Sequence, residues 1–476
     1  AAKNLDQLPS WTAPDNTLIV QAFEWHVPAD RHHWSRLKAA LPDLKAIGAD
    51  KIWIPPGCKG MDPSGNGYDI YDLYDLGEFD QKGSIATKWG TRKELEDLIC
   101  HAQALSIDII WDAVLNHKAG ADFPERFEAV EVDPKRRDVE ISKPLTIDGW
   151  VGFDFRARGN LYSSMKYHWQ HFSGVDWDDK RKHQGIYKTH APNKEWASDV
   201  SDENGNYDYL MFADLDLSHP EVRADLLHWG TWITNELSLN GMRLDAAKHF
   251  STKFQKDFVD HVRRTANPDF FVIGEYWTGD VQAIMNYLEK LEHKVTAYDV
   301  PLVQKFSRLS HTRHADLRAY AIILLRKEGH PCVFYGDLYG IRANDAARPM
   351  TPACHGKLPI LTRARKLYAY GEQEDYFDQP NCIGFVRYGN ARHRSGLACV
   401  ISNAGPAKKR MFIGRQNTNQ RWIDVLGHHA ADVLIDKWGC GLFPVNAMSV
   451  SVWVNSAAGG CGSLLEDTFN VNIYDY

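Results

Sequence analysis

Three acidic residues stand at the ends of apolar runs, where a strand would give way to a loop: Asp112 in WDAVLNH, Asp245 in GMRLDAAKHF and Glu275 in VIGEYW. A carboxylate is costly to bury there unless it is paired or hydrogen-bonded. Arg243 lies two residues before Asp245, on the same face of a strand, and can keep that acid ionised. An ionised acid beside a protonated one is the pair that glycosidic bond cleavage requires. Structural ion pairs at the rim of a sheet are the alternative interpretation.

The elements that could position these acids are strands and helices that alternate along the chain. Up to residue 371, short β-rich runs alternate with helical patterns, which is typical of βαβ units around a parallel sheet. In a (β/α)8 barrel, functional residues lie at the C-terminal ends of strands, where the three acids fall. We therefore expect a barrel over residues 1–117 and 221–371. Its strands are expected to begin near Thr17, Lys51, Ile107, Gly241, Phe270, Thr296 and Pro331.

Two regions do not follow this alternation of strands and helices. Residues 118–220 are too long a connection to lack structure of their own, so we interpret them as a small domain inserted after the third strand. In residues 372–476 the helical period disappears, and runs such as CIGFVRYG and SVSVWVN alternate with turn residues. This pattern predicts a C-terminal antiparallel β-sandwich.

Composition narrows the class of ligand. The net charge is -7, so no basic field exists to hold a nucleic-acid backbone. No apolar run approaches membrane-spanning length. The eight cysteines form no CxxC pair, which argues against a zinc site or a disulfide framework.

Aromatic residues make up 12% of the chain, and their flat faces suit sugar rings as well as cores. The absence of Asn-x-Ser/Thr favours a cytoplasmic protein, and a secreted protein with its signal removed is the alternative.

Five longer segments resemble the α-amylase family of glycoside hydrolases (family 13), closest to the liquefying bacterial-type amylases and their fungal relatives. They are GMRLDAAKH, DAVLNHKAGAD, VIGEYW, GYDIYDLYDLGEF and ENGNYDYLMFADLDLSHP. The resemblance runs from about Leu18 to Val454 and implies a catalytic barrel, a calcium-bearing inserted domain and a C-terminal β-sandwich. It further implies retaining, endo-acting hydrolysis of α-1,4-glucosidic bonds in starch and glycogen. We expect a monomer that binds α-1,4-glucan polysaccharide or maltooligosaccharide, and neither nucleic acid nor membrane.

The same motifs imply roles for single residues. Asp245 resembles the nucleophile, Glu275 the general acid/base, and Arg243 the residue that orients the nucleophile. A retaining pair has its carboxyl groups about 5 to 5.5 Å apart. The substrate contacts implied by the resemblance are Trp25, Tyr68, His117, Lys248, His249 and Trp277. For His117 and His249 a purely structural histidine is the alternative.

The resemblance also implies a structural calcium ion held by Asn116, Asp208, Asp214 and the backbone carbonyl of His249. All four ligands are hard oxygens, which suits Ca²⁺. The acids that flank a second metal in the bacterial proteins fall here at Ser173 and Ala197, and a third site's pair falls at Pro380 and Asn381. We therefore expect one calcium ion, with Asp199 as a candidate shifted ligand.

The seventh barrel strand is missing from this pattern. Between Pro301 and Cys332 lie only 30 residues, whereas a barrel of roughly 250 residues spends about 31 on each βα unit. This interval holds one predicted helix, Leu317 to Lys327. The family's third catalytic acid, in an Asn-His-Asp motif that ends the seventh strand, is not found. Asp316, Glu328 and the pair Asn344-Asp345 do not replace it.

Two hypotheses follow from the gap. The sequence omits a segment after Arg318, in which case the intact mass exceeds 54.2 kDa, or the protein is a genuine deletion variant. A deletion variant could be a catalytically dead glucan-binding protein that still holds sugar on Trp25, Tyr68 and Trp277. An α-glucan transglycosylase is the remaining alternative to a hydrolase.

Overall fold

A curved parallel sheet lies at the centre of the computed structural model, which describes residues 16–309, 315–342, 349–464 and 469–475. Its strand order is β15-β14-β13-β5-β2-β1-β16, and every neighbouring pair is parallel. The strands are β1 (Ile19–Gln21), β2 (Lys51–Trp53), β5 (Asp108–Ala113), β13 (Gly241–Leu244), β14 (Phe271–Gly274), β15 (Thr296–Ala297) and β16 (Cys332–Phe334). Most of their residues are buried, because helices cover the outer face of the sheet.

Helices with clear start signals connect these strands. In α2 the Thr91 side chain and Glu94 form a capping box, and Asp280 caps α5. The barrel helices are α1 (His33–Ala46), α2 (Arg92–Ala104), α3 (Pro220–Glu236), α4 (Thr252–Thr265), α5 (Val281–Lys290), α6 (Val300–Leu309), α7 (Ala315–Leu325), α8 (Tyr335–Tyr339) and α9 (Leu358–Tyr368). The short pair β3 (Lys59–Gly60) and β4 (Ile70–Asp72) lies in the connection from β2 to α2.

The seven strands do not close into a ring within the described part of the chain. β15 pairs only with β14, and β16 only with β1, so both are edges of the sheet. The expected helix, Leu317 to Lys327, is present as α7, but α6 is a second helix in the same interval, so the expectation of a single helix was wrong. Residues 310–314 lie outside the described residues, as do Asn344 and Asp345.

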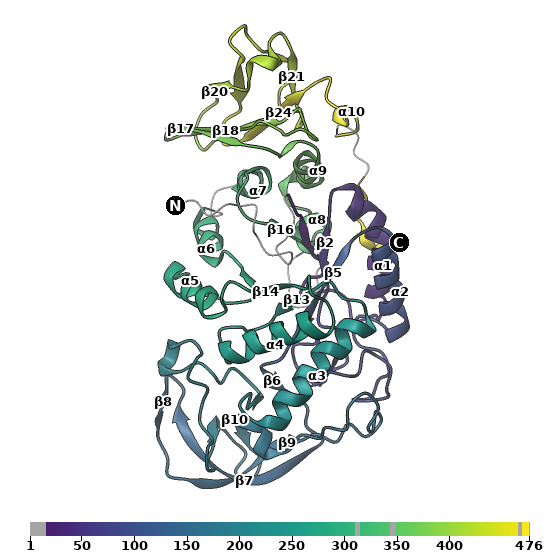
Figure 1. Cartoon of the computed structure of the whole chain (residues 1–476), viewed down its shortest axis with the longest axis vertical. Coiled ribbons are helices and arrows are strands. Elements are labelled where there is room, and N and C mark those ends of the chain that lie inside the picture. The colour runs from purple at the N-terminus through teal and green to yellow at the C-terminus, as the bar shows by residue number, and fades with distance from the viewer. Residues whose placement is uncertain (1–15, 310–314, 343–348, 465–468, 476) are drawn as a thin grey trace.

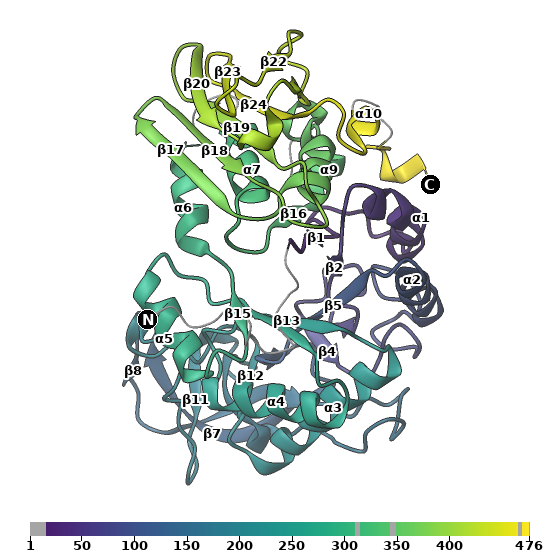
Figure 2. The same ribbon diagram turned by 45° about the horizontal axis from the view of Figure 1, so that its top comes forward.

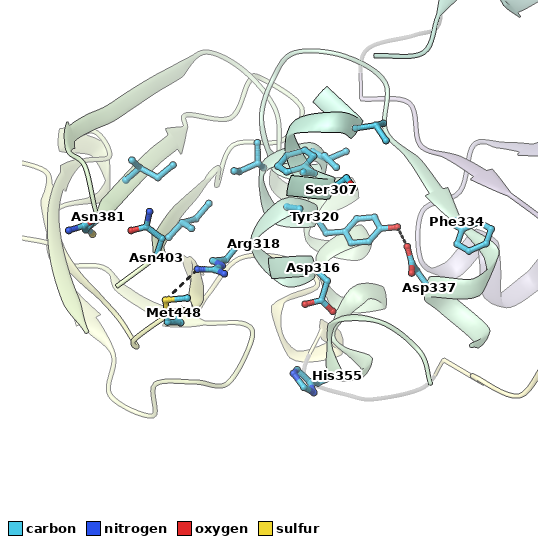
Figure 3. A pocket seen from close by; sticks show the side chains of 18 of the residues that line it. Ser307, Asp316, Arg318, Tyr320, Phe334, Asp337, His355, Asn381, Asn403 and Met448 are labelled. Carbon is cyan, nitrogen blue, oxygen red and sulfur yellow. Dashed lines mark hydrogen bonds between the residues drawn. The ribbon is translucent and has the colours of Figure 1, made fainter. Parts of the chain in front are cut away.

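A cavity of about 1410 Å³ adjoins the open edge of the sheet. Figure 3 shows that its walls come from α7, from the end of β16 and from the C-terminal strands. Phe334 of β16 and Gln21 of β1 line it on the barrel side, and Ile383 and Ile401 line it on the other. Within it the Tyr320 hydroxyl donates to Asp337. The cavity therefore lies where the sheet lacks a neighbour for β16.

The inserted region is a twisted antiparallel sheet at the opposite end of the molecule from the C-terminal strands (Figure 1). Its order is β6-β12-β10-β11-β7-β8, with β9 paired to β7. The strands are β6 (His117–Lys118), β7 (Phe123–Asp133), β8 (Arg136–Glu140), β9 (Leu145–Gly152), β10 (Phe172–Asp178), β11 (His183–Thr189) and β12 (Ala213–Leu215). Because β6 directly follows β5 and β12 precedes α3, this sheet is tied to the barrel at both ends.

The C-terminal region packs a six-stranded antiparallel sheet against a two-stranded ribbon. Trp422, Phe443 and Trp453 fill the core between them. The strands are β17 (Gln373–Gln379), β18 (Cys382–Arg387), β19 (Leu397–Ser402), β20 (Ala407–Phe412), β21 (Arg421–Asp424), β22 (Val433–Leu434), β23 (Cys440–Val445) and β24 (Val450–Asn455), followed by α10 (Cys461–Leu464). In Figure 2 this unit stands over α7 and α9, and α7 contacts β19 and β24. None of the described helices has the length and apolar character needed to cross a membrane.

Candidate active site

The three strand-end acids face the inside of the barrel at one level. Arg243 of β13 stands in register with Asp112 of β5. The hydrogen-bond ladder continues one residue past each strand, since the N–H of Asp245 donates to Ala113 at 3.0 Å and that of Glu275 to Leu244 at 3.0 Å. Asp245 follows Arg243 by two residues and therefore shares its face. The parallel ladder thus sets the backbone positions of all four side chains.

Arg243 connects the three carboxylates. Its Nη1 donates to Asp112 Oδ1 at 2.7 Å and to Asp245 Oδ1 at 2.8 Å, while Nη2 lies 2.7 Å from Glu275 Oε2. The guanidinium also lies over the ring of Trp53, 4.9 Å from its centroid. Such a buried cation is stable only because the carboxylates surround it. The sequence prediction that Arg243 lies beside Asp245 agrees with this geometry.

Each reactive acid uses one oxygen for Arg243 and keeps the other open. In the described part of the chain, Asp245 Oδ2 and Glu275 Oε1 have no hydrogen-bond partner, whereas Glu275 Oε2 also accepts the N–H of Ala246 at 3.0 Å. The Glu275 side chain is 27% exposed and that of Asp245 is 11% exposed. Asp112 has both oxygens engaged and its side chain is fully buried. The open oxygens therefore belong to Asp245 and Glu275.

Burial sets the protonation of the cluster. It raises the pKa of Asp245 to about 7; Arg243 acts in the opposite direction, and the carboxylates of Asp112 and Glu275 add to the rise. Burial lowers the pKa of Arg243, but attraction to Asp112 and Asp245 outweighs it and the arginine stays charged. We expected Arg243 to keep Asp245 ionised; it favours the ionised form, but burial is the larger effect. Asp245 therefore takes up a proton as the pH falls through about 7.

Aromatic side chains hold Asp112 and flank the site. Trp53 Nε1 and the Tyr68 hydroxyl both donate to Asp112 Oδ2, at 2.9 Å each. The ring of Trp25 stacks on Tyr68 with the centroids 5.9 Å apart and the planes at 9°. Trp25 is 63% exposed and Trp277 is 52% exposed. The structure thus leaves two flat apolar faces beside the carboxylates.

The remaining predicted substrate contacts are engaged with protein groups. His117 Nε2 donates to the Tyr68 carbonyl at 2.8 Å, and His249 Nδ1 donates to the Tyr207 carbonyl at 2.9 Å. Burial lowers the pKa of both histidines to about 4, so their rings are neutral. Lys248 Nζ pairs with Glu203 at 2.7 Å and donates to the backbone carbonyl of Trp277 at 3.1 Å. These side chains hold the walls of the site together.

The predicted metal ligands lie where β5 and the inserted sheet meet. Asn116 Oδ1 and Asp214 Oδ1 are buried and have no hydrogen-bond partner. Burial raises the pKa of Asp208 to about 8 and that of Asp214 well above its usual range. Oxygen atoms left open inside a protein are unfavourable unless a cation or water meets them. This set therefore fits a hard divalent cation.

Asp199 binds the start of α4 through one of its carboxylate oxygens. Its Oδ2 accepts the Ser251 hydroxyl at 2.9 Å, the Thr252 hydroxyl at 3.1 Å and the N–H of Lys253 at 2.8 Å. It thus ties the inserted domain to the first turn of α4, where a negative charge is favoured. The charge of Asp199 also acts on Asp208, and its assignment as a shifted ligand stays a prediction.

A second group of potential ligand atoms occurs at the start of α3. Atoms of His171, His219 and Glu221 lie within 4.8 Å of one another and could hold a metal ion. However, His171 Nδ1 accepts the N–H of His168 at 2.9 Å, and its Nε2 lies 3.0 Å from Glu221 Oε2. The ring therefore carries its proton on Nε2, the atom that would have to face a metal. We interpret the group as a hydrogen-bonded anchor of the inserted domain.

Sequence reasoning missed three residues of this region. Trp53 ends β2, so the rule that located the acids could also have found it. Glu203 and Lys194 lie in irregular parts of the inserted domain, and no periodic pattern marks them. Only the folded chain brings Glu203 to Lys248 and Lys194 to Asp216.

Known proteins share this organisation. The model of the α-amylase catalytic domain matches residues 34–306. The chain is 41% identical to a glucan 1,4-α-maltohexaosidase of Bacillus sp. (strain 707) over 484 residues, covering 92% of each chain. It is 42% identical to an α-amylase of Bacillus licheniformis over 482 residues, covering 92% of this chain and 93% of that one. Both alignments are longer than the 476 residues of this chain, so these relatives carry residues without a counterpart in it.

A solved structure shows the same fold. The Anoxybacillus α-amylase superimposes with a TM-score of 0.60 at 17% identity, covering 92% of this chain and 98% of that chain. The predicted (β/α)8-type architecture with a C-terminal β domain is thereby confirmed, apart from the seventh strand. With the matching catalytic domain and the two close relatives, these findings show that the chain belongs to the α-amylase family of glycoside hydrolases.

Proposed function

We propose that this protein hydrolyses α-1,4-glucosidic bonds within starch- and glycogen-type glucans and retains the anomeric configuration. The observation that carries the proposal is the pair of open oxygens on Asp245 and Glu275, whose other oxygens are fixed by Arg243. Two carboxyl groups held by one cation on neighbouring strands are suited to double displacement. The names of the close relatives support α-glucan as the substrate class.

In the first step Asp245 acts as nucleophile and Glu275 as acid. Asp245 Oδ2 attacks the anomeric carbon, and the bond from that carbon to the leaving oxygen breaks. Glu275 Oε1 gives its proton to that oxygen, so the leaving sugar departs as an alcohol. Glu275 is the more exposed of the two side chains, which allows it to meet the departing chain.

In the second step a water molecule replaces the leaving sugar. Glu275, now ionised, takes a proton from the water, and the hydroxide oxygen attacks the anomeric carbon while the bond to Asp245 breaks. Arg243 keeps its contact with Asp245 Oδ1 throughout and so holds the nucleophile in one orientation. The stacked rings of Trp25 and Tyr68 support the sugars beside the bond that is cut.

We further propose a structural calcium ion bound by Asn116, Asp208, Asp214 and the carbonyl oxygen of His249. The support is the pair of buried, unpartnered oxygens on Asn116 and Asp214. When bound, the ion would supply positive charge that keeps the two buried aspartates ionised. Because Asn116 follows β5 and Asp208 and Asp214 belong to the inserted region, the ligands join the two parts of the site.

Release of reducing ends from soluble starch, measured with and without calcium, tests the function. We expect release by the intact protein and, by NMR, an initial product in the α-anomeric form. Release of the β-anomer would exclude double displacement by Asp245. Starch binding without release of reducing ends would support the glucan-binding alternative. Transfer of glucosyl units to an added sugar would support the transglycosylase.

A further inference from the structure

A lysine of the inserted domain lies against the acidic group at the proposed calcium centre. The Lys194 ammonium pairs with Asp216 Oδ2 and also donates to the backbone carbonyl of Gln170. Both side chains of the pair are 9% exposed. Lys194 is a surface-loop residue by sequence, since it follows Pro192 and Asn193, yet its charged end is almost enclosed. A cation held this far from water needs a specific partner.

Asp216 belongs to the same acidic group as the proposed ligands. It follows β12 by one residue, and the charges of Asp208 and Asp216 both act on Asp214. Three carboxylates are therefore gathered in one buried place. Arg137 also acts on Asp214, but from beyond ion-pair distance, because its guanidinium donates to the Tyr209 carbonyl. Lys194 is the cation that forms a direct ion pair within this group in the described part of the chain.

The chain's own groups occupy most of the carboxylate oxygens. Asp216 Oδ1 accepts the Ser218 hydroxyl at 2.5 Å, and Asp216 Oδ2 accepts Lys194. Asp214 Oδ2 accepts the Ser173 hydroxyl, and Asp208 Oδ2 accepts the N–H of Ala197 at 2.9 Å. Asp214 Oδ1 and the neighbouring Asn116 Oδ1 remain open and buried. Lys194 therefore binds the carboxylate of the group that is not among the proposed calcium ligands, and the open oxygens belong to the proposed ligands Asn116 and Asp214.

We propose that Lys194 is a built-in cation of this metal centre: its ammonium occupies the position of a second metal ion and limits the centre to one calcium per chain. The inference rests on the calcium centre proposed above. The proposal also explains the contact of Ser173. Its hydroxyl donates to Asp214 Oδ2, an oxygen that would otherwise be open to a further cation.

Metal content and thermal unfolding of Lys194→Met test the inference. The wild-type protein should bind one Ca²⁺ per chain by titration calorimetry and elemental analysis, and sodium chloride should raise its Tm no more than choline chloride does. Lys194→Met leaves Asp216 without its counter-ion. We expect this variant either to take up a second Ca²⁺ equivalent or to gain Tm from sodium chloride but not from choline chloride. The double variant Lys194→Met/Asp216→Asn should return to one Ca²⁺ and lose the sodium effect.

Lys188→Met is the matched control. Lys188 of β11 is 10% exposed and pairs with Glu140 and Glu195, neither of which is a proposed calcium ligand. The Lys188→Met variant should have a lower Tm than the wild type, with the same calcium stoichiometry and the same response to sodium. One Ca²⁺ and no sodium effect in Lys194→Met would overturn the role of Lys194 while leaving the calcium centre intact. Two Ca²⁺ in the wild type would also overturn it, and no Ca²⁺ in the wild type would remove the centre itself.

Discussion

The backbone N–H of Ala246 donates to the Glu275 carboxylate over 3.0 Å, and this hydrogen bond joins the loops that follow β13 and β14. Ala246 has a φ of 52°, a left-handed conformation that is uncommon for a residue with a side chain. The turn directly after Asp245 thus directs the N–H of Ala246 toward Glu275, the acid that follows β14. The position of Glu275 is therefore set by the nucleophile loop as well as by its own strand.

Glu275→Gln should remove catalysis and keep the fold. The amide oxygen of glutamine can still accept the Ala246 N–H, but the side chain no longer carries an acidic proton. We expect the cleavage rate to fall by about 10²- to 10⁴-fold, with binding to soluble starch retained. Glu292→Gln, which changes an exposed carboxylate paired with Lys256 and Lys294 outside the site, is the control and should keep the activity. Unchanged activity of Glu275→Gln would remove this residue from its proposed role.

The pH dependence should follow the ionisation of the nucleophile Asp245. Because burial raises the pKa of Asp245 to about 7, this carboxyl group is protonated at low pH and becomes ionised as the pH rises. Only the ionised form can attack the anomeric carbon, so kcat/KM should increase as the pH rises through about 7. Initial rates on a short maltooligosaccharide between pH 5 and 9 measure this limb. A rate that is constant between pH 5 and 9 would contradict the assignment.

Arg243→Gln should destabilise the protein as well as inactivate it. Its side chain is 5% exposed, and its loss leaves Asp112, Asp245 and the partly exposed Glu275 without this counter-ion. Breaking a buried ion pair in this way costs about 3–5 kcal/mol. Urea unfolding measures the loss. Arg421→Gln is the control, because Arg421 is 69% exposed and its 3.7 Å pair with Asp432 should contribute less than about 1 kcal/mol. Equal losses in the two variants would show that the Arg243 cluster is not held by charge.

The sequence predicted the reactive centre well, because the acids end apolar runs and a parallel sheet brings such ends together. Asp112, Arg243, Asp245 and Glu275 meet as that rule requires. Long-range partners were not predictable in this way. The capping of α4 by Asp199 joins residues more than fifty positions apart through a loop with no periodic pattern. The second helix between β15 and β16 was missed because the expected barrel rhythm assigned its residues, Val300–Leu309, to a strand end and a loop.

Trp25→Ala should weaken substrate binding more than turnover. The ring is 63% exposed and stacks on Tyr68, so its outer face is free to meet a sugar. Losing a contact of about 1 kcal/mol should raise KM for maltooligosaccharides roughly 5-fold and leave kcat within about 2-fold. Trp438→Ala is the control, because that ring is 56% exposed but lies in the C-terminal domain. Equal effects of the two substitutions would argue against a sugar contact at Trp25.

The open edge of the barrel leads to a prediction about the chain itself. β16 has a partner on one side only, and the cavity of about 1410 Å³ adjoins it. The buried backbone groups of an unpaired central strand cost about 1 to 3 kcal/mol each. The alignments with close relatives are longer than this chain, which agrees with a missing segment. We therefore predict that the natural polypeptide has an intact mass above 54.2 kDa, with the additional residues between α6 and β16.

Intact-mass spectrometry and peptide mapping of the protein purified from its source would decide this point. A heavier chain with extra peptides between Leu309 and Cys332 should carry the closing strand and release reducing sugar from starch. A chain of 54.2 kDa would establish a true deletion. In that case the edges at β15 and β16 should make the barrel easy to unfold, and a low urea midpoint together with absent hydrolysis would favour the glucan-binding alternative. Full activity at 54.2 kDa would instead show that Asp245, Glu275 and Arg243 suffice without a seventh strand.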